Sequence, residues 1–242
     1  MTGSSTERAP EILYEDNHLV AVNKRPSEIV QGDKTGDAPL GEEVKKYLKA
    51  KYHKPGDVFL GIAHRLDRPV SGVLIFARTS KALERLNRMF AGKEIKKTYW
   101  AVVGVRPPAD SGRLVHYLTR NQEKNISKAH DSEVKGSRKA ELMYRLAGKS
   151  DRYYFLEINP LTGRHHQIRC QLSAIGCPIK GDIKYGFPRT NSNASIHLHS
   201  RKAEFVHPVS GKEVQILASP PNDPLWKKFA EIEPDKKQRW QP

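Results

Sequence analysis

An aspartate between two arginines is the first feature of this sequence that could do chemistry. Asp67 lies between Arg65 and Arg68 in the stretch Gly61–Arg78, GIAHRLDRPVSGVLIFAR. Neighbouring guanidinium groups favour the ionised form of a carboxylate, and an ionised aspartate can act as a nucleophile or as a base. A turn signal follows, and then an apolar run over 73–77 that predicts a buried strand. We therefore treat Asp67 as a candidate catalytic group, with a surface ion pair as the alternative.

A second candidate is the string TGRHHQIR at positions 162–169. The spacing predicts a helix over 164–175 with Ile168 facing inward. A helix N-terminus with these side chains is suited to bind an anion or a base edge, which makes Arg164 a candidate ligand. Arg169 flanks the buried face, where an arginine needs a carboxylate partner, and we expect that partner to be Asp67.

A tyrosine among basic residues, Tyr99 in the string KKTYW, is the third candidate. Strand alternation puts Tyr99 on the face opposite Trp100. Aromatic rings beside cations suit base stacking and phosphate contact. An ordinary core tyrosine is the alternative when this string is taken alone.

The histidines and cysteines invite a metal site, but their spacing gives it little support. The chain has no CxxC pair and no HExxH motif, and His197 and His199 are only a two-ligand hint on one strand face. A phosphate loop of the Walker or dinucleotide type is also missing. We therefore expect no metal and no cofactor. Cys170 and Cys177 would close only a short loop, so we expect two free thiols in a reducing cytoplasm.

The charge balance predicts a polyanionic partner. The 242 residues include 42 Lys and Arg against 27 Asp and Glu, for a net charge of +15. Nucleic acid is the first candidate partner and a membrane surface the second, while a merely soluble basic protein is the alternative. No apolar run is long enough to span a membrane, and the N-terminus has no hydrophobic core of a signal peptide. These features favour a cytoplasmic protein.

The elements that must position these residues point to an α+β fold with flanking helices on a mixed, mostly antiparallel sheet. We expect one catalytic domain over 11–232, a disordered lead over 1–10 and a polar basic tail over 233–242. The segment 119–137 is nearly free of apolar residues, which predicts a long exposed loop whose lysines and arginines wrap a phosphate backbone. We expect strands over 11–14, 19–23, 73–77, 97–105, 113–118, 140–146, 153–158, 195–200, 203–207 and 213–217, and helices over 40–52, 81–90, 164–175 and 223–232.

Five ordered motifs resemble those of the RluA-type RNA pseudouridine synthases. They are LVAVNKRPSEIVQG, HRLDRPVSG with its following strand, KKTYWAVV, LTGRHHQIRCQLSAIGCPIKGDIKYG and IHLHSRKAEFVHPVSG. Together they run from about residue 11 to residue 217. The family isomerises uridine in RNA to its carbon-linked isomer without a metal or cofactor, so the resemblance implies an isomerase of the pseudouridine synthase fold.

The resemblance also implies roles for individual residues. Asp67 matches the catalytic aspartate, which attacks the anomeric carbon of the ribose or removes a ribose proton. Tyr99 matches the tyrosine that stacks on the target base and helps to move the proton from carbon 5. Arg169 matches the arginine paired with that aspartate, and Arg65 matches the arginine that fills the gap left by the flipped base. Leu198 matches an apolar residue beneath the base.

Three further substrate contacts are expected at His64, Arg164 and Ile168, next to these positions. The sequence departs from the family pattern at Arg25 and Glu28 in the first motif, and His165 fills a position where a small hydroxyl residue is commoner.

We expect a standalone, monomeric catalytic module acting on structured ribosomal or transfer RNA. A non-catalytic RNA-binding protein on the same fold is the alternative function, and a metal-dependent nuclease is a third. The sequence leaves open which uridine is modified and by which of the two routes Asp67 acts.

Overall fold

The computed structural model describes residues 9–32 and 36–232, and the fold is built on one large mixed sheet. The lead and tail expected over 1–10 and 233–242 lie outside the described residues, apart from residues 9 and 10. The strands are β1 (Ile12–Glu15), β2 (Leu19–Lys24), β3 (Gly61–Ile62), β4 (Ser71–Ala77), β5 (Lys96–Val103), β6 (Ser111–Asn121), β7 (Ile126–His130), β8 (Arg138–Lys149), β9 (Tyr154–Pro160), β10 (Leu198–Val206) and β11 (Glu213–Leu217). The helices are α1 (Leu40–Lys51), α2 (Ser80–Ala91), α3 (Gln167–Ala174) and α4 (Pro224–Ile232), with a 3-10 turn over Ile183–Tyr185.

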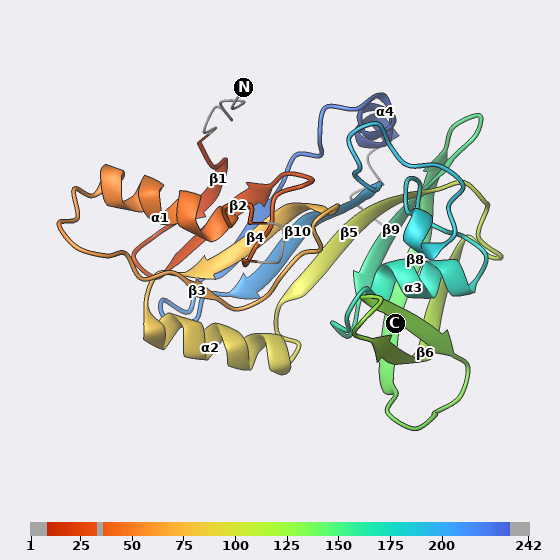
Figure 1. The fold of residues 1–242 in the computed structure, drawn as a ribbon, viewed down its shortest axis with the longest axis horizontal. Coiled ribbons are helices and arrows are strands. Elements are labelled where there is room, and N and C mark those ends of the chain that lie inside the picture. Colours follow the sequence, from red (N-terminus) through yellow and green to blue (C-terminus); the bar gives the residue numbers. More distant parts are fainter. Residues whose placement is uncertain (1–8, 33–35, 233–242) are drawn as a thin grey trace.

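The strand order among the described residues is β1-β2-β4-β10-β5-β9-β8-β6-β7, with β11 paired to β10 and β3 paired to β4 (Figure 1). Every pair is antiparallel except β4 with β10, which run parallel. The predicted α+β class with a mostly antiparallel sheet is confirmed.

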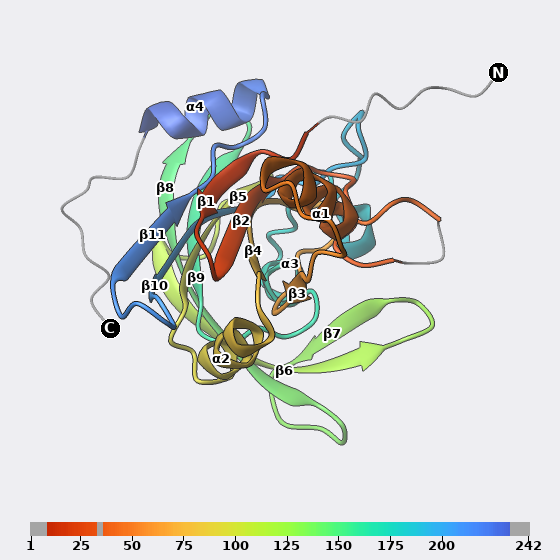
Figure 2. The same ribbon diagram turned by 90° about the vertical axis from the view of Figure 1, so that its left-hand side faces the viewer.

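Helices cover both faces of the sheet, and strand alternation decides which side chains they meet. From β4, Leu74 packs with Val44 of α1, while the next residue, Ile75, packs with Leu86 of α2. Helix α3 shares the core of α1, and α4 lies on the opposite face, where Trp226 packs against β5 (Figure 2). The face with α1 and α3 carries the candidate site.

Local sequence signals account for the strand β4 and the helix after it. The Thr79 side chain accepts a hydrogen bond of 3.1 Å from the backbone N–H of Ala82, so Thr79 is the N-cap of α2. Gly72 in β4 has φ +113°, and any side chain there would collide with the backbone of Ser200 in β10. Glycine is therefore required where the two parallel strands meet.

The exposed loop predicted over 119–137 is wrong in its first half. Strand β6 continues to Asn121, and β7 returns from Ile126 to form a hairpin. Ile126 packs against a small core around Leu118 and Tyr185, and Ser127 is 5% exposed. A few apolar contacts and the pairing of β7 with β6 thus order a segment whose composition alone indicated a loop. Its basic side chains remain exposed.

The two strands predicted over 195–200 and 203–207 are one strand, β10. Its pairing with β5 shifts register between Ser200 and Lys202. An irregularity of this kind bends a strand without ending it, which explains why the polar residues 201 and 202 looked like a break.

Among the described residues, no helix has both the length and the apolar character needed to cross a bilayer.

Candidate active site

Asp67 lies on a tight turn between β3 and β4, and the core anchors the turn on both sides. Leu66 is 8% exposed and Val70 is 2% exposed. The backbone N–H of Val70 donates to the carbonyl oxygen of Asp67 at 3.0 Å. The Asp67 side chain keeps 29% of its surface exposed, so a rigid turn presents an accessible carboxylate.

A buried lysine ties this turn to the neighbouring strand. Nζ of Lys24, at the end of β2, donates to the carbonyl oxygens of Arg25 and Arg68 at 3.0 Å and of Val70 at 2.7 Å. Lys24 is fully buried, and burial lowers its pKa to about 8. The three carbonyls replace the lost hydration of the ammonium and fix the backbone that follows Asp67.

The start of α3 is set by polar contacts at its first turn. His166 precedes the helix in the left-handed region, with φ +50°. The Gln167 side chain accepts hydrogen bonds from the Arg164 N–H at 2.9 Å and from the Thr162 hydroxyl at 2.7 Å. The helix therefore begins at Gln167, not at Arg164 as the sequence predicted, because residues 164–166 form the turn that aims α3 at the site.

Arg169 of α3 is the centre of a buried ionic network. Its Nε and Nη2 donate to both oxygens of Asp182 at 2.7 and 2.9 Å, and its Nη1 donates to Oδ2 of Asp67 at 3.0 Å. Burial opposes the charge, but the hydrogen bonds and charge of Asp182, with those of Asp67, outweigh it and raise the pKa of Arg169. The predicted pairing of Arg169 with Asp67 is observed, and Asp182 is an additional partner that the sequence did not reveal.

The two carboxylates differ in what they leave free. Asp182 is 1% exposed and gives both oxygens to Arg169. Asp67 gives Oδ2 only, and among the described residues Oδ1 has no hydrogen-bond partner. One oxygen of Asp67 is thus oriented by a fixed guanidinium while the other keeps its lone pairs for a ligand.

A histidine also faces Asp67, and its tautomer follows from its neighbours. The Tyr185 hydroxyl lies 2.9 Å from Nδ1 of His166 and accepts a hydrogen bond of 2.8 Å from the Ser127 N–H. Nε2 of His166 lies 3.5 Å from Oδ2 of Asp67, and a carboxylate oxygen can only accept, so the proton of the neutral ring sits on Nε2 and Nδ1 accepts from the Tyr185 hydroxyl. Burial lowers the pKa of His166 to about 3, so the ring is neutral at neutral pH.

Tyr99 lies on β5 with its side chain 8% exposed, in the same core cluster as Ile168 and Leu198. Burial is the main cause that raises its pKa to about 12. A hydrogen bond with Ser200 opposes this shift, and the charge of Asp67 adds to it. Tyr99 is therefore a neutral phenol at neutral pH. Trp100 faces the other side of the sheet, as predicted.

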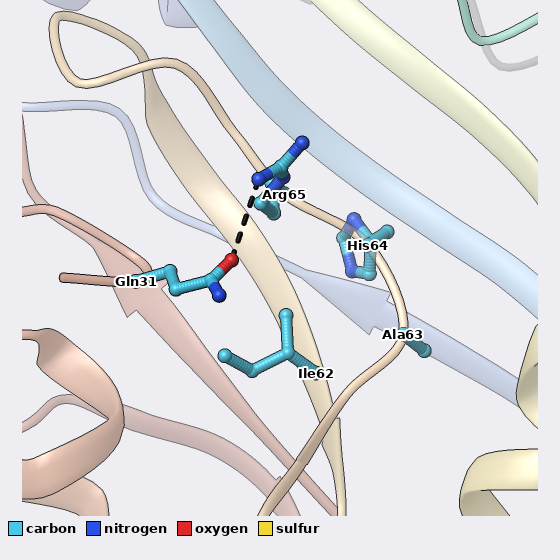
Figure 3. Close-up of a pocket in the computed structure, with 5 residues that line it drawn as sticks. All are labelled: Gln31, Ile62, Ala63, His64 and Arg65. Carbon is cyan, nitrogen blue, oxygen red and sulfur yellow. Dashed lines mark hydrogen bonds between the residues drawn. The ribbon is translucent and has the colours of Figure 1, made fainter. Parts of the chain in front are cut away.

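Arg65 and His64 line a cavity of about 280 Å³ beside the turn, together with Gln31, Ile62 and Ala63 (Figure 3). Nη1 of Arg65 donates to Oε1 of Gln31 at 3.3 Å. Nε2 of His64 accepts a hydrogen bond of 3.0 Å from the Ile75 N–H. Arg65 thus belongs to the cavity rather than to the carboxylate.

The two arginines next to Asp67 in the sequence do not contact its carboxylate. Within the described part of the chain its charged partner is Arg169, 102 positions away, whereas Arg65 contacts Gln31 and Arg68 pairs with Asp37. Proximity in sequence therefore did not become contact at this turn.

Arg164 is exposed and lies apart from this network. Its Nε donates to the carbonyl oxygen of Lys139 at 3.0 Å. The described residues contain no group of three or more histidine, cysteine, aspartate or glutamate side chains arranged to hold a metal ion. Both cysteines are free thiols, as expected.

The site combines four chemical elements on one face of the sheet. A carboxylate with a free oxygen is fixed by a buried arginine, a neutral phenol lies nearby, an apolar floor includes Leu198, and an exposed arginine stands at an adjoining cavity. These residues can bind a ligand that has a flat ring with apolar faces, and they place a carboxylate beside it that can act as a nucleophile or a base.

Comparison with known proteins gives consistent results. Residues 18–174 match the family model described as RNA pseudouridylate synthase. The chain is 34% identical to ribosomal large subunit pseudouridine synthase C of Buchnera aphidicola over 88% of this chain and 68% of that protein. It is 30% identical to tRNA pseudouridine synthase C of Vibrio vulnificus over 91% of this chain and 94% of that protein. Its fold matches human RNA pseudouridylate synthase domain containing 4, with a TM-score of 0.74, 21% identity and 92% of each chain covered.

Proposed function

The chain belongs to the RNA pseudouridylate synthase family, and from this premise we propose that it isomerises uridines in structured ribosomal or transfer RNA, with Asp67 as the catalytic carboxylate. The observation that carries the proposal is the pairing of one Asp67 oxygen with Arg169 while the other oxygen stays free. Relatives named for each of the two RNA classes support both as substrates.

The Asp67 geometry is compatible with two routes. In one, Oδ1 attacks C1′ of the ribose, and the bond from C1′ to N1 breaks with its electron pair passing to uracil. In the other, the carboxylate removes a ribose proton as that bond breaks. In the first route, the freed uracil turns and C5 bonds to C1′ as the bond from C1′ to Oδ1 breaks and its electron pair returns to Asp67. In the second, C5 of the turned uracil bonds to C1′ as the carboxylate returns the ribose proton. In both, the C5 proton then leaves and N1 gains a proton. Atoms balance without an oxidant or a metal.

The remaining residues support steps around the carboxylate. Tyr99 stacks on the uracil and, being a phenol with its pKa raised to about 12, holds the ring as a neutral group. Leu198 and Ile168 form the apolar floor under it. The target nucleotide must leave its stack to reach Asp67, and the exposed Arg65 fills the gap. His64 and Arg164 contact neighbouring nucleotides, and residues 11–232 act as one catalytic unit.

The test is release of tritium from carbon 5 of labelled uridine in total tRNA and ribosomal RNA taken from a strain that lacks the gene. The wild type releases tritium, and Asp67→Asn lowers the rate by at least about 1,000-fold because the nucleophile or base is lost. Asp57→Asn, at an exposed aspartate in the loop between α1 and β3, is the control and keeps the rate.

Absence of release by the wild type contradicts the activity. If the wild type still binds RNA in that experiment, the non-catalytic RNA-binding function replaces the proposal. Release that persists in Asp67→Asn leaves the activity standing and removes Asp67 from it.

A further inference from the structure

Lys97 of β5 is a partly buried cation that meets no carboxylate. Among the described residues its ammonium group forms no ion pair and no hydrogen bond, and its contact is with the ring of Phe90, whose centre lies 5.7 Å from Nζ. Burial lowers the pKa of Lys97 below its ordinary value, with no opposing contribution from an acid. A desolvated charge without a partner costs stability, so a ligand is the natural reason to keep it.

The residues around Lys97 belong to the loop that carries Asp67 and to the turn that precedes α3. A Cβ built on Gly163, in the turn before α3, would lie 3.8 Å from Nζ of Lys97. His64, three residues before Asp67, packs on the same Phe90 ring in a tilted arrangement, with 4.6 Å between ring centres. Strand alternation places Lys97 on the side of β5 that carries Tyr99 two residues later.

The backbone of Lys97 is held in place by hydrogen bonds within the protein, before any ligand binds. The Asn159 amide donates to the carbonyl oxygen of Lys97 and to the Thr98 hydroxyl, both at 3.1 Å. His64 adds a second donor beside Lys97. Its Nε2 accepts from the backbone and its pKa is lowered to about 3, mainly by burial, so the neutral ring carries its proton on Nδ1, which has no partner among the described residues.

We propose that Lys97 binds a phosphodiester group of the RNA strand next to the nucleotide that Asp67 attacks. This inference rests on the proposed function and names a contact that positions the substrate. A phosphodiester suits the place because it is a compact anion, and every nucleotide placed at Asp67 brings one on each side. A point-charge ammonium and one neutral N–H match such a group, and no carboxylate in the described ranges competes for the lysine.

The experiment compares Lys97→Met with Lys96→Met. Lys96 is the neighbouring lysine, exposed and opposite Glu204 of β10, so it controls for the loss of one positive charge from the same strand. Two quantities are measured on total tRNA and ribosomal RNA from a strain lacking the gene: the Kd at several salt concentrations by filter binding, and kcat and KM by tritium release. Thermal unfolding is followed for each variant.

Lys97→Met raises Kd and KM at least about tenfold, and Lys96→Met changes them less than about twofold. The slope of log Kd against log salt falls by about 0.7 to 0.9 in Lys97→Met, the value for one phosphate contact. Its Tm equals or exceeds that of the wild type, because a partly buried charge that pairs with no acid among the described residues is removed. Lys97→Arg keeps the charge and stays close to the wild-type Kd.

A Kd for Lys97→Met within twofold of the wild type, or a fall in kcat alone, overturns the proposal. A lower Tm with unchanged binding assigns Lys97 to the fold through Phe90 instead. These outcomes are separate from failure of the enzyme activity, because the Kd measurements keep their meaning even if the wild type releases no tritium.

Discussion

Arg169 donates hydrogen bonds to two carboxylates: Asp182, which fixes the guanidinium, and Asp67, which the guanidinium orients. Asp182 takes two donors in a fully buried, planar pairing, and this fixes the guanidinium plane. Asp67 takes one and remains reachable. Asp182 therefore helps to fix the orientation of the Asp67 carboxylate through Arg169. It lies 13 positions beyond Arg169 and does not contact the Asp67 carboxylate itself.

Replacing Asp182 by Asn should destabilise the protein and misplace Asp67. Removing Asp182 leaves the buried guanidinium with the partly exposed Asp67 as its remaining carboxylate among the described residues, so the free energy of unfolding in urea should fall by about 3 kcal/mol. Tritium release should fall as well, mainly through kcat. Asp110→Asn is the control, since it breaks an exposed pair with Arg106 and should cost less than about 1 kcal/mol. Equal stability of the two variants would remove the anchoring role of Asp182.

For individual residues, the sequence predicted the contacts that follow from helical periodicity and burial. Arg169 beside a buried helical face required a carboxylate, and Asp67 was the expected one. Asp182 could not be found in the same way, because it lies in a glycine-punctuated loop without a periodic pattern. The tautomer of His166 depends on a carboxylate and a tyrosine from two other segments, so it too appears only in three dimensions.

Among the elements, the hairpin of β6 and β7 departs most from the prediction, because its polar composition indicated an exposed loop. Ile126 and Ala129 supply the few apolar contacts of β7, and Ser127 donates its N–H to the Tyr185 hydroxyl, which is one of the contacts that fix this polar strand to the site. The same hydroxyl sets His166. The hairpin is therefore joined to the carboxylate side of the molecule through Tyr185 while its outer side chains remain exposed.

Neutralising three exposed cations of this hairpin should weaken RNA binding without unfolding the protein. The triple variant Arg120→Gln, Lys124→Gln and Lys128→Gln should lower the slope of log Kd against log salt by about 2, close to 0.7 per phosphate contact. The matched control removes three exposed lysines on the opposite face of the sheet, Lys212, Lys227 and Lys228. Equal losses in the two triple variants would show a general charge effect in place of a hairpin contact.

Across the whole molecule, buried neutral histidines link stability to pH. Burial lowers the pKa of His64 and His166 to about 3 and that of His199 to about 4. Burial keeps His199 neutral, and the hydrogen bond of 3.1 Å to the Ala218 carbonyl opposes this lowering of its pKa. A second hydrogen bond, of 2.9 Å with the Ser71 hydroxyl, helps to fix the ring. These rings come from three parts of the chain, so protonation opposes the packing of the entire sheet.

The free energy of unfolding should be steady above pH 6.5 and should fall as pH drops from 6.5 toward 4. The unfolded chain binds protons at an ordinary histidine pKa while the folded chain does not, so each ring costs up to about 1.4 kcal/mol per pH unit in this window. Between pH 7 and 5.5 we expect a loss of about 2 to 4 kcal/mol in urea unfolding. His199→Gln should flatten this dependence and the exposed His53→Asn should not. A profile unchanged down to pH 4 would contradict the assignment.

The fold class, the helices and most strands followed from alternation and turn signals, because those depend on local pattern. The strand β10 was divided in two since its bend lies at polar residues, and the pairing that carries it through, with β4 and β5, joins distant segments. The parallel contact of β4 with β10 had no local signature except Gly72.

That contact has a consequence for how the protein is made. The strand that follows Asp67 pairs at Ser71 and Gly72 with His199 and Ser200, and the Ser71 and His199 side chains bond across 128 positions. On the ribosome the chain emerges from its N-terminus, so this stretch of β4 keeps one open edge until residue 200 has appeared. The pocket around Asp67 is thus completed late in synthesis, and a nascent chain carrying every residue of the Asp67–Arg169–Asp182 network still lacks the strand that closes it.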